Sequence, residues 1–214
     1  MNNTVELLSH FGNDLMVVNA ARVSYGKSKD ILDEKDAKLI KYLVDHKHTA
    51  PFRHPQLQFR IKCPIFVERQ LFKHQVGMTS NSTSGRYVDF SDSCYHIKIL
   101  RKQSQSSKQG SEGIVDRPDL IQKIDAHIKN SQDLYKELCN ANVAKEQARA
   151  ILPLALETTF IWTGSMLAFI HLWELRLKPD TQEETRIIAA EMLRLVKTIE
   201  GNPFQHTIVA FGLV

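Results

Sequence analysis

The stretch at 66–87 constrains the fold of this chain more than any other part of the sequence. Its first part, FVERQLF, repeats apolar residues at helical spacing with polar residues between them, which predicts an amphipathic helix. We expect Gly77 to end this helix, because the segment TSNSTSG that follows shortly after it has no apolar side chain. Small residues let backbone N–H groups approach a ligand and Arg86 offers a bidentate fork, so the loop suits a phosphate or another anion. An ordinary solvated loop is the competing interpretation, and composition alone favours it.

The composition of the 214 residues is typical of a globular protein, and we expect a single domain over 1–214. The net charge of +4 is too small to indicate nucleic acid as a partner. Cys63, Cys94 and Cys139 are far apart and form no CxxC pair, which argues against a disulfide framework and for a reducing, cytoplasmic compartment. No signal pattern is visible and polar residues interrupt the longest apolar run, so we expect no membrane as a partner.

The periodicity predicts an α+β fold in which a small, mostly antiparallel sheet packs with several long helices. Besides the helix in 66–87, helices are expected at 33–45, 120–138, 143–151, 165–177 and 181–199. Strands are expected at 5–11, 15–18, 56–63, 96–100 and 158–163. Within 56–63, Leu57, Phe59 and Ile61 alternate with polar residues, which is typical of a half-buried strand. The polar segment 103–113, rich in Ser, Gln and Lys, is expected to be a mobile insertion.

Five segments, in chain order, resemble the signature of the flavin-dependent thymidylate synthases. Segments 73–75 (KHQ) and 79–87 (TSNSTSGRY) together are similar to that family's Arg-His-Arg helix end and Ser-x-Asn-Glu-x-Ser-x-Arg-Tyr loop. The other four are ARVSY at 21–25, HTAPFRH at 48–54, EQARAILPL at 146–154, and LR at 175–176 with Gln182, Glu184 and Arg186 behind it. The departures are Lys73 and Gln75 for two arginines, Ser82 for Glu, Ala50 for a hydroxyl residue, and Ser165 and Leu167 for Asn and Arg.

The resemblance implies reductive methylation of dUMP to dTMP, in which methylenetetrahydrofolate supplies the carbon and NADPH supplies hydride through FAD. Family members work without a cysteine nucleophile, and none of the three cysteines of this chain lies in a shared motif. In its place a cation polarises the pyrimidine and stabilises the negative charge that develops, and by resemblance that cation is Arg176. Taken alone, Arg176 would be a solvated cation at a helix end. The resemblance also implies a homotetramer whose active sites draw residues from several subunits, with dUMP and folate as further partners.

By the same resemblance, two sets of residues bind the ligands. The expected dUMP contacts are Gln70, Lys73, Ser82, Thr83, Ser84, Gly85, Arg86, Arg149 and Arg176. The expected FAD contacts are Ala50, Lys73, His74, Gln75, Ser82, Ser165, Met166, Leu167 and His171. Arg86 and Arg149 would clamp the phosphate, because guanidinium groups match phosphate bidentately. Without the resemblance, Arg149 would form an ion pair with Glu146, and His171 would be a satisfied histidine in the core.

Three other functions compete with the synthase. A nucleotide-binding relative that has lost catalysis would bind dUMP without flavin and without turnover, since several of the altered residues belong to the expected flavin contacts. A metal-dependent hydrolase could use His46, His48, His54 and His74, but the sequence has no HExxH pattern, and we expect no metal. A basic RNA-binding module would need an aromatic-rich motif, which we do not find.

Overall fold

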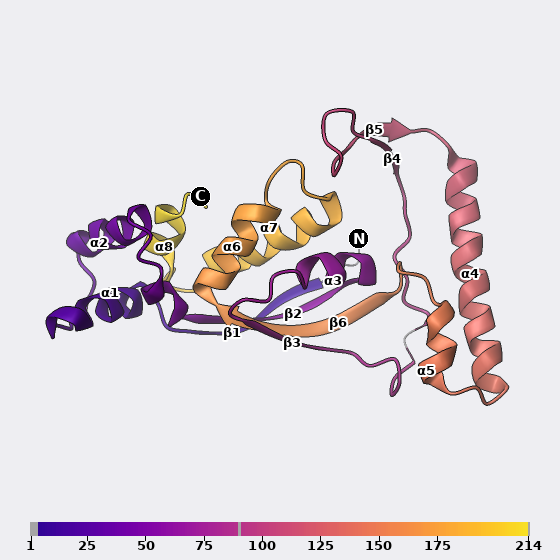
Figure 1. Ribbon diagram of the computed structural model, residues 1–214, viewed down its shortest axis with the longest axis horizontal. Coiled ribbons are helices and arrows are strands. Elements are labelled where there is room, and N and C mark those ends of the chain that lie inside the picture. The colour runs from indigo at the N-terminus through magenta and orange to yellow at the C-terminus, as the bar shows by residue number, and fades with distance from the viewer. Residues whose placement is uncertain (1–3, 90, 214) are drawn as a thin grey trace.

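The computed structural model describes residues 4–89 and 91–213, which form a four-stranded antiparallel sheet, a separate hairpin and eight α-helices (Figure 1). The strands of the sheet, in spatial order, are β1 (Thr4–Phe11), β2 (Gln56–Pro64), β6 (Glu157–Ser165) and β3 (Met78–Ser82). The hairpin consists of β4 (Leu100–Gln103) and β5 (Ser111–Val115). The helices are α1 (Asp14–Arg22), α2 (Glu34–Asp45), α3 (Ile65–Leu71), α4 (Pro118–Asn140), α5 (Lys145–Ala148), α6 (Met166–Arg176), α7 (Glu183–Lys197) and α8 (Gln205–Ala210). The predicted α+β class is confirmed.

One face of the sheet is apolar, and helices cover it. Leu57, Phe59 and Ile61 of β2 are buried, as are Phe160 and Trp162 of β6. Helices α3, α6 and α7 lie over this face and complete the main core (Figure 1). Each such buried side chain contributes about 1.5–3 kcal/mol of transfer free energy. The alternation predicted for 56–63 is therefore confirmed.

Two glycines let β3 lie close to β6, at the edge where the site forms. A Cβ atom on Gly164 would lie 2.9 Å from Cγ of Met78 and 3.0 Å from the carbonyl oxygen of Gly77, so a larger residue would force the strands apart. Gly77 has a φ of 75°, in the left-handed region that glycine adopts without strain. It turns the chain into β3, whose first residue pairs with Gly164.

Two predicted strands are wrong. Residues 15–18 lie in α1, because the Asn13 side chain accepts the N–H of Met16 at 3.0 Å and caps a helix there. Residues 96–99 lie outside any strand, and β4 begins only at Leu100. In both segments the apolar run was too short for its period to separate helix from strand.

The chain between α3 and the polar loop also differs from the prediction. Helix α3 ends at Leu71, well before Gly77. The expected loop then begins as strand β3, whose polar residues pair with β6 through their backbones. An edge strand of a sheet can remain polar because one of its sides faces solvent.

The segment 103–113 contains the tip of the β4–β5 hairpin and the strand ends beside it (Figure 1). The Gln103 side chain donates hydrogen bonds to the carbonyl groups of Ser107, Lys108 and Gly110, which organise the tip. Its mobility stays a prediction.

Helices α4 and α5 lie beside one end of the sheet, where α4 covers a small separate core (Figure 1). Ile128 of α4 packs there with Cys94 and Leu156, and Tyr135 of α4 is buried as well. Among the helices of residues 4–89 and 91–213, none is both long and apolar enough to cross a membrane.

Candidate active site

The edge strand β3 connects the two ends of the candidate site. It pairs with β6 from Met78, opposite Gly164, to Ser82, opposite Phe160. Five residues of antiparallel strand span about 14 Å. The Ser82 end opens into a cavity, whereas the Met78 end adjoins the start of α6, where the N–H of Ser165 donates to the carbonyl of Gly77 at 3.1 Å.

A cavity of ≈ 320 Å³ lies between the polar loop and the helices α3 and α4. Four of the predicted dUMP contacts line it: Ser82, Thr83, Gly85 and Arg149. The Thr83 N–H and hydroxyl both donate to the carbonyl of Thr159, at 2.8 and 3.0 Å, and so hold the loop against β6. Among the described residues of the lining, Arg149 is the one cation. Hydroxyl groups and a guanidinium around one cavity suit a phosphate group.

Arg176, at the end of α6, is half-buried and held by two acceptors. Its Nε donates to Nε2 of His74 at 3.0 Å, and its Nη2 donates to the carbonyl of Gln70 at 3.3 Å. The interpretation of Arg176 as a solvated helix-end cation is therefore wrong. Burial lowers the pKa of Arg176 but leaves the guanidinium charged.

His74 is neutral beside this cation. Burial, then the charges of Arg176 and His171, lower the pKa of His74 from 6.5 to about 4. Because Nε2 accepts the Arg176 hydrogen bond, we assign the ring proton to Nδ1. A neutral acceptor of this kind orients the guanidinium without cancelling its charge.

We expect His74 to stay uncharged down to a pH of about 4, which ¹H–¹³C NMR of the imidazole measures directly. Since the folded pKa lies below the unfolded value, the stability that His74 contributes is complete above pH 6.5 and is lost as the pH falls from 6.5 towards 4. Arg176→Ala should raise the His74 pKa, because it removes a neighbouring positive charge. Arg194→Ala, a change at an exposed ion pair on α7, should leave the pKa where it was. Titration of His74 near 6.5 in the unmodified protein would contradict this assignment.

A second hollow of ≈ 290 Å³ lies at the Met78 end of β3. The aromatic rings of Phe72 and Trp162 contribute to its lining, together with His74, Gln75 and Met78. Phe72 also lines the larger cavity, so the two spaces adjoin the same side chain. This hollow contains two of the predicted FAD contacts, His74 and Gln75.

Comparison with known proteins identifies the family. A family model described as "Thymidylate synthase complementing protein" matches residues 6–200. The chain belongs to this family. A flavin-dependent thymidylate synthase from Thermus thermophilus is 38% identical over 193 residues, which cover 90% of this chain and 71% of the relative. Another, from Kosmotoga olearia, is 37% identical over 198 residues, covering 91% and 85%. The resemblance seen in the sequence is therefore confirmed.

A solved structure supports the same assignment of fold. The UMP/dUMP methylase PolB from Streptomyces cacaoi, bound with 5-Br dUMP, superposes with a TM-score of 0.87 at 26% identity. The match covers 99% of this chain and 95% of PolB. The sheet, its helices and the hairpin thus form the fold of a thymidylate synthase complementing protein.

Several predicted contacts lie outside both spaces. Lys73, Ser84 and Arg86 line neither the cavity nor the hollow, and the Arg86 guanidinium instead stacks 5.3 Å from the centre of the Tyr87 ring. Gln70 does not line the cavity either, and its amide donates to Oε1 of Gln182 at 3.3 Å. The roles of these residues in binding dUMP stay predictions.

The predicted FAD contacts around the start of α6 also stay predictions. Ala50 is exposed in a short 3₁₀ helix, and Ser165 caps α6 by accepting the Ala168 N–H at 3.2 Å. The side chains of Met166 and Leu167 lie in the core, so only their backbones could reach a ligand.

The two non-family interpretations of Arg149 and His171 can now be judged. His171 is exposed, so its interpretation as a core histidine is wrong. Arg149 lines the cavity, and among the ion pairs of the described residues none joins it to Glu146.

Two of the four histidines considered for a metal site make other contacts. His46 stacks on Tyr42 with ring centres 3.9 Å apart, and His74 contacts Arg176. Within the described part of the chain, no group of three or more His, Cys, Asp or Glu side chains is placed to hold a metal ion.

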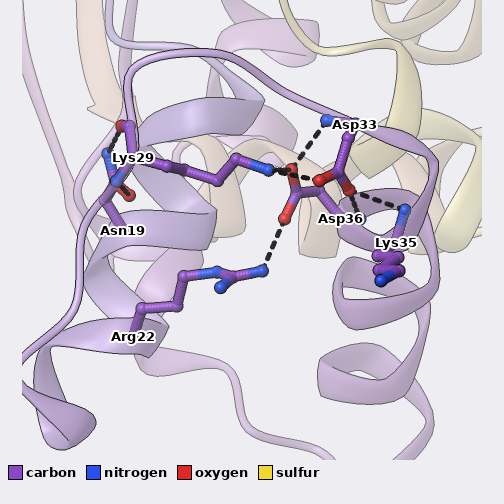
Figure 2. A network of polar contacts seen from close by, with 6 residues as sticks. All are labelled: Asn19, Arg22, Lys29, Asp33, Lys35 and Asp36. Carbon is purple, nitrogen blue, oxygen red and sulfur yellow. Dashed lines mark hydrogen bonds and ion pairs between the residues drawn. The ribbon is translucent and has the colours of Figure 1, made fainter.

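The family motif ARVSY at 21–25 is anchored by a buried carboxylate, which Figure 2 shows. Asp36 is fully buried and accepts hydrogen bonds from Nη2 of Arg22 at 2.8 Å and from Nζ of Lys29 at 2.5 Å. It also accepts the N–H of Asp33 at 2.8 Å, which completes the capping box of α2. Burial would raise the pKa of Asp36, but these hydrogen bonds outweigh it and lower the pKa. The network fixes the chain that connects α1 to α2.

The family motif behind Arg176 forms a chain of hydrogen bonds that supports α3. Gln182 accepts from Gln70 and donates through Nε2 to Oε2 of Glu184 at 3.0 Å. Glu184 is buried and accepts from Nη2 of Arg101, at 2.6 Å, so the hairpin is tied to the same chain. Arg101 was not recognised from the sequence, because it lies more than 80 residues from Glu184 in a polar segment.

Glu68 of α3 was also missed. It lines the cavity and accepts the Ser82 hydroxyl at 2.7 Å. Its spacing in the sequence could have revealed it, because Ile65, Glu68 and Phe72 recur at intervals that place them on one face of a helix. All three line the cavity.

Proposed function

We propose that this protein catalyses the flavin-dependent reductive methylation of dUMP to dTMP, with methylenetetrahydrofolate as carbon donor and NADPH as reductant. Family membership supports the reaction class. The observation that carries the proposal is the half-buried Arg176 guanidinium, which His74 and the Gln70 carbonyl hold in place. A second cation, Arg149, lines the larger cavity. One cation thus serves the phosphate, and the other serves the negative charge that develops on the base.

Each cation has its own task in this proposal. Arg149 and the Thr83–Gly85 loop bind the phosphate, and the hydroxyl and backbone groups of the loop add hydrogen bonds. Arg176 polarises a carbonyl oxygen of the pyrimidine and stabilises the negative charge that develops when carbon 5 becomes nucleophilic. The neutral His74 keeps the guanidinium in place, so little reorganisation is needed during the reaction.

The residues around the smaller hollow fit FAD. Phe72, Met78 and Trp162 offer apolar contacts, and the Gln75 amide offers polar contacts. The exposed Lys73, next to His74 in the chain but outside the lining, offers a cation for the cofactor phosphates. We infer that these residues, with His74, hold FAD. When bound, a flavin supplies reversible hydride transfer, whereas the protein supplies placement and electrostatics.

The cysteines are poorly suited to act as nucleophiles. Burial raises the pKa of Cys63 and of Cys94, so neither thiol is readily ionised. We expect the triple variant Cys63→Ser/Cys94→Ser/Cys139→Ser, if folded, to retain turnover within about tenfold of the unmodified protein, because no step needs a thiolate. Steady-state dTMP formation measures this, with circular dichroism as the folding control. A folded, flavin-loaded but inactive variant would indicate a cysteine nucleophile.

We further propose that the protein acts as a homotetramer in the cytoplasm. The predicted FAD contact Ser165 lies at the far end of β3 from the cavity, where its N–H donates to the Gly77 carbonyl, and this supports a site completed by other copies. Exposed apolar side chains, among them Tyr25, Ile31 and Val76, are available for contacts between copies. All three cysteines are free thiols, as expected in a reducing compartment.

Release of tritium from dUMP labelled at carbon 5 tests the proposed reaction. The assay supplies FAD, NADPH and methylenetetrahydrofolate, and then omits each in turn. Release that requires all three is expected. UMP is the comparison substrate, because the structural neighbour PolB is a UMP/dUMP methylase. Absence of release from folded protein that binds dUMP would favour the alternative of a nucleotide-binding relative that has lost catalysis, with Gln75, Ser82 and Ser165 as the first residues to restore.

A further inference from the structure

Glu68 places an acceptor inside the nucleotide cavity. Its Oε1 accepts the hydroxyl of Ser82 at 2.7 Å, and Ile65 and Phe72 on the same helix face make the adjoining wall apolar. The ion pairs of residues 4–89 and 91–213 involve other carboxylates, so no cation of the described chain neutralises Glu68. The carboxylate therefore has lone pairs free for a hydrogen-bond donor from a ligand.

The surroundings of Glu68 make such a donor favourable. Burial raises the pKa of this carboxyl group, and the Ser82 hydroxyl counters the effect only in part. A half-buried carboxylate gains more from a new hydrogen bond than an exposed one, because water satisfies it less well.

The cavity also limits which part of the nucleotide meets Glu68. Arg149 in the same lining suits the phosphate, whereas Arg176, which acts on the base, lies outside the lining. The sugar connects these two ends. Its 3′-hydroxyl is the one free hydroxyl donor that the deoxyribose of dUMP offers.

We propose that Glu68 is a further substrate-binding residue, which accepts a hydrogen bond from the 3′-hydroxyl of the deoxyribose. This inference rests on the proposed function, because it takes dUMP as the ligand. The Ser82 hydroxyl, held by the same carboxylate, completes the contact from the loop.

Isothermal titration of the full chain with dUMP and with 2′,3′-dideoxyuridine 5′-monophosphate tests the inference. The unmodified protein should bind dUMP about 10- to 100-fold more tightly than the dideoxy analogue, the range for a hydrogen bond to a charged group. Glu68→Ala should bind both equally, with dUMP affinity lowered to that of the analogue. Glu68→Gln keeps a neutral acceptor, so its preference for dUMP over the dideoxy analogue should lie between those of the unmodified protein and of Glu68→Ala. Glu137→Ala, at an exposed site on α4, is the matched control and should behave as the unmodified protein.

A rescue variant separates a binding role from a merely structural one. Since Ser82 Oγ lies next to the Glu68 carboxylate, a glutamate at 82 can bring its own carboxylate to the same place. Glu68→Ala/Ser82→Glu should regain the preference for the 3′-hydroxyl. If Glu68→Ala does not fold, the test becomes the preference for dUMP over the dideoxy analogue, compared between Glu68→Gln and the unmodified protein.

Three results would overturn the inference. An unchanged dUMP preference in the Glu68 variants, in protein that binds and turns over dUMP, would refute the role of Glu68 and leave the proposed function intact. Loss of discrimination against N3-methyl-dUMP instead would assign Glu68 to the base. Failure of the unmodified protein to bind dUMP would refute both proposals.

Discussion

Arg176→Ala should reduce dTMP formation by about a hundredfold to a thousandfold in kcat, the range for loss of one preorganised group that stabilises developing charge. The guanidinium is half-buried, and its two hydrogen bonds, to His74 and to the Gln70 carbonyl, fix its direction. Removing it takes away the cation that we propose polarises the pyrimidine. Steady-state kinetics with tritium release from labelled dUMP measures the loss, and the flavin absorbance of the purified variant should be unchanged.

Two further variants sharpen this prediction. Arg176→Lys keeps the charge but loses the Nε donor to His74, so its activity should lie between those of the alanine variant and the unmodified protein. Arg194→Ala removes an exposed arginine that pairs with Glu191 on α7 and should leave kcat as it was. Normal turnover in Arg176→Ala would remove this residue from the mechanism.

Asp36→Ala should lower the free energy of unfolding by about 3 kcal/mol, near the lower end for breaking a buried ion pair. Asp36 is fully buried, and its removal leaves Arg22 and Lys29 without their carboxylate and opens the capping box of α2 (Figure 2). The loss falls at the low end because both cations are partly exposed and regain contact with water. Urea unfolding followed by circular dichroism measures the change.

The matched control lies on the same helix. Asp45→Ala breaks an exposed pair with Lys41 and should cost no more than about 0.5 kcal/mol. Because the pKa of Asp36 is lowered in the folded protein, the stability that it contributes is complete above its ordinary value of 3.8 and is lost as the pH falls through the lowered pKa. The free energies of unfolding of Asp36→Ala and Asp45→Ala should therefore become similar in strong acid. Equal midpoints at neutral pH would show that the buried network does not stabilise the fold.

Much of the fold and part of the candidate site could be predicted from local sequence. The alternation of Leu57, Phe59 and Ile61 predicted the buried face of β2, because the side-chain period of a strand is two residues. Five short motifs in chain order identified the family, and the one around Arg176 supplied the cation with which we propose that the reaction begins. These features depend on residues that lie within a few positions of one another.

Local pattern was insufficient where the structure depended on a distant partner. Strand β3 is too polar to be recognised as a strand, and only its pairing with β6 makes it one. Residues 15–18 fitted a strand by composition, but the Asn13 cap made them helical.

The sequence by itself thus determined the family and the α+β class, and it supplied the prediction of which cations serve the site. Only the tertiary structure decided what each cation contacts, because His74 and Arg176 are 102 positions apart in the chain. It also brought Glu68 to Ser82, which lie on different elements and share no sequence period. Their contact arises from the packing of α3 and β3 against β6, since tertiary packing brings together residues that no local pattern relates.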